Sequence, residues 1–75
     1  MTPNGVGTQI EARREKTGLT QLQLATLTGV TQGTIAKYEN GKIMPSWPVM
    51  RRVSLALGCD PADLVSRVKR GRRAA

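Results

Sequence analysis

Two side chains in the middle of this chain carry hydrogen-bonding groups suited to the edges of nucleic-acid bases. The Gln32 carboxamide both donates and accepts, which matches adenine, and the Lys37 ammonium group can donate to guanine. On an isolated stretch of chain, both would more often be ordinary surface residues. Their meaning therefore depends on the element that carries them.

Groups suited to catalysis are few. The sequence has no histidine, and its single cysteine, Cys59, has no base beside it. The acidic residues are scattered, and Asp60 and Asp63 are explained by the start of a helix. The Gly-Val-Gly segment at 5–7 lacks the strand and the spacing of a phosphate-binding loop. We therefore predict no catalytic site, no metal site and no cofactor, and interpret Cys59 as a small apolar filler.

The positive charge is concentrated at one end of the chain. The net charge is +7, and residues 67–75 hold five basic groups and no acid, which leaves +2 for the first 66 residues. A basic tail of this kind indicates a polyanionic partner, most often nucleic acid. A solvated tail that only improves solubility remains an alternative. We expect a loose arm at 1–5, one domain at 6–68 and a basic tail at 69–75.

Length and composition indicate one small domain with an aliphatic core. A chain of 75 residues is marginal without good packing, and this one has a single Trp, a single Tyr and no Phe. No apolar run approaches the roughly 18 residues of a membrane span, and the first residues do not resemble a secretory signal. One cysteine cannot form an internal disulfide. These features predict a cytoplasmic, nucleoid-associated protein with no membrane partner.

An all-α fold of five helices is expected, because helix signals recur along the chain and no period-two run predicts a strand. The first helix covers 6–17. The others begin after the expected N-caps Thr20, Thr31, Ser46 and Asp60. The fourth helix carries Trp47, which we expect to pack against the core. A stacking role for this residue is the weaker alternative, since stacking proteins usually expose several aromatic side chains.

Residues 20–41 are the most informative segment. Gln23 stands at the capping-box spacing from the expected N-cap, Leu24 and Leu27 are expected to face inward, and Gly29 suits a tight turn. Two short helices joined by about four residues that include a glycine are the signature of a helix-turn-helix motif. The second helix of such a motif lies in the major groove of DNA.

A projection of that second helix separates two faces. Ile35 and Tyr38 share the inner face, and Glu39 turns to the same side. The outer face carries small or polar residues with one cation: Gly33, Lys37 and Asn40, with Gln32 at the open N-terminal end.

The segment 7–65 resembles the phage-repressor type of helix-turn-helix domain, the Cro/repressor class also called the XRE family. It covers nearly four-fifths of the chain. The matching pieces occur in order and at the usual spacings: Ile10 and Arg14; Gly18-Leu19-Thr20-Gln21; Leu24-Ala25; Gly29-Val30-Thr31; Ile35; Tyr38-Glu39-Asn40-Gly41; Pro45-Ser46; Leu57-Gly58 and Leu64.

The resemblance implies a five-helix, lambda-repressor-like bundle that binds double-stranded DNA sequence-specifically, commonly as a homodimer. It predicts a transcriptional regulator, in particular a repressor, of a bacterium or phage. The residues expected to contact bases are Gln32, Gly33, Thr34 and Lys37. Those expected to contact phosphates are Gln21, Thr31, Asn40 and Lys42. Arg14 and Glu39 are expected to form a structural ion pair, since a carboxylate turned toward the core needs a partner.

The sequence departs from the family pattern in three places. Gly33 stands where a base-reading side chain is common, so direct readout is expected to be sparse. Arg13 stands where many relatives have leucine, and the loop 43–45 is less basic than in several repressors. The Thr34 hydroxyl has two open roles, a contact to DNA or a bond to the preceding turn.

Two rival functions stay open. The same fold can serve as a protein-interaction module, as in an antitoxin or a bridging factor, with a protein partner in place of a DNA site. Alternatively, the basic tail can act as a nonspecific nucleic-acid coat. The sequence does not assign Arg51 and Arg52 to solvent, to DNA or to a dimer contact.

Overall fold

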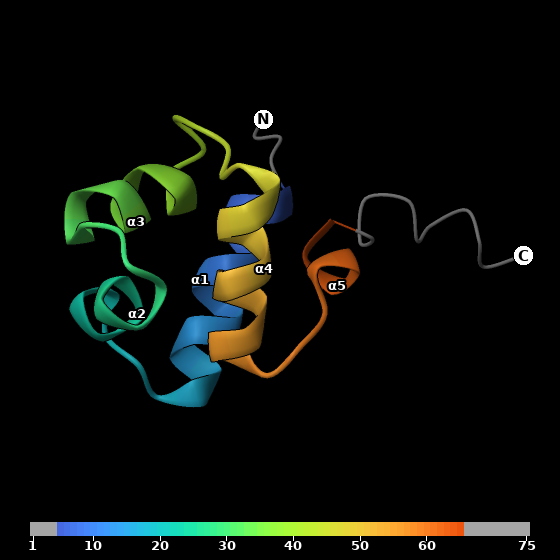
Figure 1. Ribbon diagram of the computed structural model, residues 1–75, viewed down its shortest axis with the longest axis horizontal. Coiled ribbons are helices and arrows are strands. Elements are labelled where there is room, and N and C mark those ends of the chain that lie inside the picture. The colour runs from blue at the N-terminus through green and yellow to red at the C-terminus, as the bar shows by residue number, and fades with distance from the viewer. Residues whose placement is uncertain (1–4, 66–75) are drawn as a thin grey trace, which may run out of the picture.

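The computed structural model describes residues 5–65, which contain five α-helices and no strand (Figure 1). The predicted all-α architecture is confirmed. The first helix begins one residue earlier than expected, and the tail at 69–75 lies outside the described residues. None of these helices has the length and apolar character needed to cross a bilayer. The helices are α1 (Gly5–Thr17), α2 (Gln21–Thr28), α3 (Gln32–Glu39), α4 (Trp47–Leu57) and α5 (Pro61–Val65).

The starts of α2, α3 and α4 form where the sequence predicts them. The Thr20 hydroxyl accepts from the Gln23 amide at 3.0 Å, and the Gln23 side chain accepts from the Thr20 amide at 2.9 Å, which completes a capping box. Thr31 and Ser46 cap α3 and α4. Gly29 ends α2 with a φ of +78°, a conformation that side chains disfavour. These caps define short helices with abrupt turns between them.

The helices surround one aliphatic core. In Figure 1, α4 crosses in front of α1, with α2 and α3 on one side of this pair and α5 on the other. Each helix contributes buried apolar residues, so the small domain has a continuous interior. The buried hydrophobic residues are Val6, Ile10, Leu24, Ala25, Ile35, Tyr38, Met50, Val53, Leu57 and Leu64.

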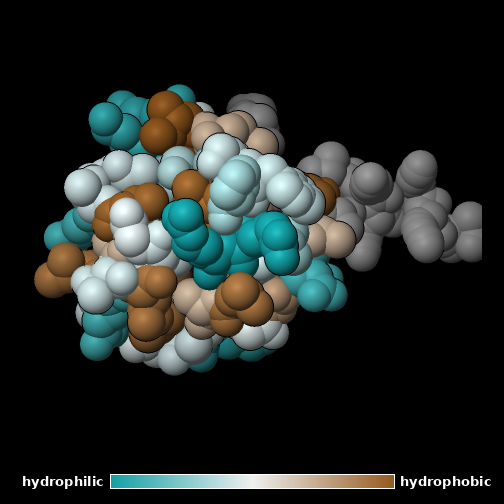
Figure 2. Space-filling view, in the orientation of Figure 1, coloured by the Kyte–Doolittle hydropathy of each residue, from teal (hydrophilic) through white to brown (hydrophobic). Residues whose placement is uncertain are grey.

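Two predictions about the core are wrong. Leu27 is 60% exposed, because the buried side of α2 consists of Leu24, Ala25 and Thr28. The buried Thr28 hydroxyl donates a hydrogen bond to the Leu24 carbonyl at 2.8 Å. Trp47 is 58% exposed, because it is the first residue of α4 and the buried stripe begins one turn later. Figure 2 shows apolar side chains on the surface over α2.

Gly7 sets the distance between α1 and α3. A Cβ atom at this position would collide with the Tyr38 carbonyl oxygen and lie 3.0 Å from that of Glu39. The absence of a side chain therefore lets α1 pass directly against the last turn of α3. Sequence reasoning gave Gly7 no such role, because the contact depends on the backbone of another helix. The contact positions α3 on the bundle.

Candidate nucleic-acid interface

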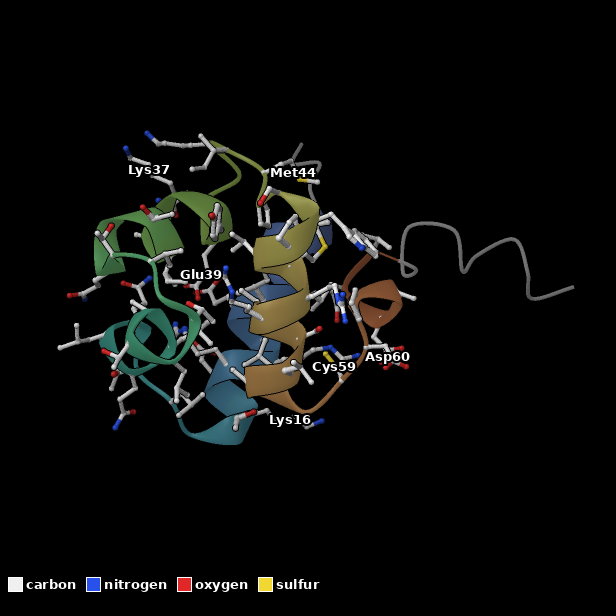
Figure 3. All side chains as sticks on the ribbon, in the orientation of Figure 1. Lys16, Lys37, Glu39, Met44, Cys59 and Asp60 are labelled. Atoms are coloured by element: carbon white, nitrogen blue, oxygen red, sulfur yellow. The ribbon has the colours of Figure 1, made fainter. Side chains whose placement is uncertain are left out.

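The inner and outer faces of α3 differ in burial. Ile35 is fully buried and Tyr38 is 6% exposed, so these two side chains attach the helix to the core. Gln32, Gly33 and Lys37 are exposed, as the projection of the sequence predicts. In Figure 3, Lys37 points away from the bundle. The helix therefore presents an amide, a bare stretch of backbone and a cation to the outside.

The first turn of α3 contains a small hydroxyl network. The Thr31 hydroxyl accepts from the Thr34 amide at 3.1 Å, and the two hydroxyl oxygens lie 2.9 Å apart. Thr34 is half-buried and Thr31 is exposed. Of the two roles left open for the Thr34 hydroxyl, the structure shows the local bond to the preceding turn.

Arg14 and Glu39 lie together beneath α3. The Arg14 Nε donates to Glu39 Oε2 at 2.7 Å, and Nη2 donates to Oε1 at 3.2 Å. The side chains are 11% and 4% exposed, so water screens the pair poorly. Arg14 Nη1 also donates to the Leu19 carbonyl at 2.9 Å. The hydrogen bond to Glu39 raises the pKa of Arg14, and the pair connects α1, the turn before α2 and the end of α3.

Gln21 also belongs to this cluster, which the sequence did not predict. Its Nε2 donates to Glu39 Oε1 at 3.0 Å, while the side chain stays partly exposed. Figure 3 shows Glu39 directed inward, between α3 and α2. Nothing in the spacing of two polar residues in different helices signals such a bond. One carboxylate thus receives hydrogen bonds from both α1 and α2.

The residues after α3 form a second polar edge. Asn40 and Lys42 are exposed, and their backbone amides donate to the carbonyls of Ala36 and Lys37, each at 2.9 Å. Thr31 lies at the start of α3, and Asn40 and Lys42 follow its last residue. Gln21 begins α2, and its side chain meets the last residue of α3, Glu39.

The remaining cations and the cysteine lie elsewhere. Arg51 and Arg52 are both exposed, and Arg52 Nη1 donates to the Thr28 carbonyl at 3.3 Å, at the end of α2. Cys59 is partly buried against the core, and this burial raises the pKa of its thiol. Across residues 5–65, no cluster of side chains has the composition to hold a metal ion.

Comparisons with known proteins identify the family of this chain. The pattern of a helix-turn-helix family, HTH_3, matches residues 10–64. An uncharacterized HTH-type transcriptional regulator of Methanothermobacter thermautotrophicus is 43% identical over 51 residues, which are 68% of this chain and 74% of the relative. An endothelial differentiation-related factor 1 homolog of Danio rerio is 41% identical over 56 residues, which are 75% of this chain but 38% of the relative.

A solved structure gives the same result in three dimensions. The P22 c2 repressor, in complex with a synthetic operator, superposes with a TM-score of 0.78 and 31% identity. The match covers 83% of this chain and 94% of the repressor chain. The chain belongs to the helix-turn-helix family of DNA-binding transcriptional regulators, of the XRE type.

Proposed function

We propose that this chain binds double-stranded DNA at preferred sequences and represses transcription, with α3 lying in the major groove. The observation that carries the proposal is the difference in burial between the two faces of α3. The inner residues are buried, whereas Gln32, Gly33 and Lys37 are exposed and can contact base edges. The similarity to a repressor solved with a synthetic operator supports it.

Contacts to the sugar-phosphate backbone hold α3 in place in this proposal. Gln21 approaches phosphates on one side of the groove, and Asn40 and Lys42 approach them on the other. Thr31 contacts a phosphate at the start of α3. Such contacts set the register of a protein on a duplex, whereas sequence is read from the base edges. A repressor in this position blocks polymerase by occupying the site. As a homodimer, it would meet half-sites about one helical turn apart, roughly 34 Å.

Selection of binding sites from random duplexes at near-physiological salt tests the proposal. We expect one enriched motif, with dyad symmetry where a homodimer binds. Deletion of residues 69–75 should weaken binding to all sequences similarly and flatten the salt dependence, because those residues supply charge and no base contacts. Recovery of random sequences after several rounds would contradict sequence-specific binding and favour a nonspecific nucleic-acid coat.

A protein-interaction module is the second candidate, and one observation favours it. An open, largely apolar hollow of about 430 Å³ lies along α2 and includes the exposed Leu22 and Leu27. A double substitution of these leucines by glutamine tests its importance. Under the repressor proposal, operator affinity and regulation in cells both persist. Loss of regulation with operator affinity intact would show that a protein partner carries the function.

A further inference from the structure

We propose that Glu39 is a positioning residue for DNA binding: it holds the Gln21 carboxamide so that one N–H of its nitrogen stays free for a phosphate. This inference rests on the proposed function, in which Gln21 meets the DNA backbone. Glu39 itself is too deeply buried to reach DNA, since its side chain is only 4% exposed. Its effect on DNA therefore passes through Gln21.

The chemistry of the two groups determines which way the carboxamide faces. A carboxylate paired with a guanidinium group only accepts hydrogen bonds, so the nitrogen of Gln21 must face Glu39, as the 3.0 Å contact between Nε2 and Oε1 shows. The carboxamide nitrogen carries two hydrogens. Glu39 receives one of them, and the other remains for an acceptor outside the bundle. Without Glu39, the carboxamide can rotate and turn its oxygen toward the phosphate. The two electron-rich oxygens then repel each other.

The pairing with Arg14 makes this arrangement compatible with an anionic partner. An isolated carboxylate near DNA would repel the phosphate, but the Arg14 Nε lies 2.7 Å from Glu39 Oε2 and compensates the charge. Two hydrogen bonds from Arg14 also fix the carboxylate in one rotamer. The orientation of Gln21 is thus set before DNA arrives, and binding does not have to order a mobile side chain, a cost of up to about tenfold in affinity.

Replacement of single phosphates tests the proposal in a duplex of the selected sequence. Neutral methylphosphonates are placed one at a time along the backbone, and the affinity of each duplex is measured. For the wild-type chain, we expect several positions to lower affinity, one for each contacted phosphate, and about tenfold at the phosphate of Gln21, as for a lost hydrogen bond to a charged group. In Gln21→Ala, the methylphosphonate at that one position should have no further effect, while the others keep theirs. That pair of results identifies the phosphate that Gln21 contacts.

Two matched double variants then test Glu39. Arg14→Met/Glu39→Leu replaces the buried pair by apolar side chains, an exchange that many folds tolerate. It should bind DNA but lose most of the tenfold sensitivity at the phosphate of Gln21. Arg14→Met/Glu39→Gln restores an acceptor oxygen for Gln21 without a charge, and should recover most of that sensitivity. Full sensitivity in the leucine variant would overturn the positioning role and leave the proposed function intact.

A measurement on the unmodified chain covers the case in which a double variant does not fold. The two side-chain N–H resonances of Gln21 are followed by NMR during titration with the selected duplex. We expect one proton to keep its shift, because it remains bonded to Glu39, and the other to move. If the Glu39-bonded proton moves as well, the carboxamide leaves the carboxylate on binding and the inference is wrong. If no methylphosphonate that weakens wild-type binding loses its effect in Gln21→Ala, Gln21 contacts no phosphate, and both the inference and that part of the proposed function fail.

Discussion

The two sides of the eight-residue helix α3 differ in their surroundings: one side packs into the core, and the other faces solvent. On the inner side, Ile35 and Tyr38 fill the core and Glu39 is held by an arginine and a glutamine from other helices. On the outer side, Gln32, Gly33 and Lys37 are exposed. The comparison teaches that the rigid side allows the free side to vary. In the proposed function, outer residues can therefore change what the helix recognises without changing where it lies.

The largest expected effect is on the inner side, at the ion pair. Arg14→Ala leaves Glu39 buried without its partner and should lower the free energy of unfolding by about 3–5 kcal/mol. Thermal unfolding measures the loss. Arg13→Ala is a matched control on the same helix, because the Arg13 side chain donates to Gln9 Oε1 at 3.2 Å and forms no ion pair within residues 5–65. Its loss should cost less than about 1 kcal/mol. Equal melting temperatures for the two variants would show that the buried ion pair contributes no more to stability than the Arg13 side chain.

The next effect concerns the close approach of α1 to α3. Gly7→Ala forces the new Cβ against the carbonyl oxygens of Tyr38 and Glu39, so one helix must shift. Overpacking of this kind should lower the free energy of unfolding by about 1–3 kcal/mol. Chemical denaturation measures it, and DNA affinity should fall as well, because the shift displaces α3. A variant as stable as the wild type would mean that α1 moves without strain.

On the outer side, the effects should appear in recognition and not in stability. Gln32→Ala and Lys37→Ala should each lose about 1–3 kcal/mol of discrimination at one base position. Both side chains are exposed, so unfolding should change by no more than about 0.5 kcal/mol. Binding is measured against duplexes that differ at single positions. A uniform loss over all duplexes would reassign the residue to the phosphate backbone.

The smallest effect is a gain. At Gly33, an added Cβ would have the Thr31 hydroxyl oxygen, 4.0 Å away, as its nearest neighbour, so alanine fits without strain. Gly33→Ala should raise the free energy of unfolding by about 0.5–1 kcal/mol, because alanine favours the helix. Denaturation measures this gain, and site selection measures any change of motif. A loss of stability here would show that the outer side is less independent of the inner side than the structure indicates.

Local signals in the sequence were sufficient for the helices. Thr20, Thr31 and Ser46 cap them where short polar side chains precede helical periodicity, and Gly29 and Gly58 end them with positive φ. Helix periodicity also predicted which residues of α3 are buried and which are exposed. These features depend on neighbours within one or two turns, so the order of residues alone contains them.

Contacts between helices required the tertiary structure. Helix periodicity predicted that Leu27 is buried, but the way α2 packs on the bundle leaves its side chain exposed. The bond between Gln21 and Glu39 joins residues 18 positions apart, and the role of Gly7 depends on a carbonyl group of another helix. The sequence by itself determined the five helices and the two faces of α3. Only the packing of helix against helix decided which polar groups meet beneath α3, because distances between helices depend on every side chain that separates them.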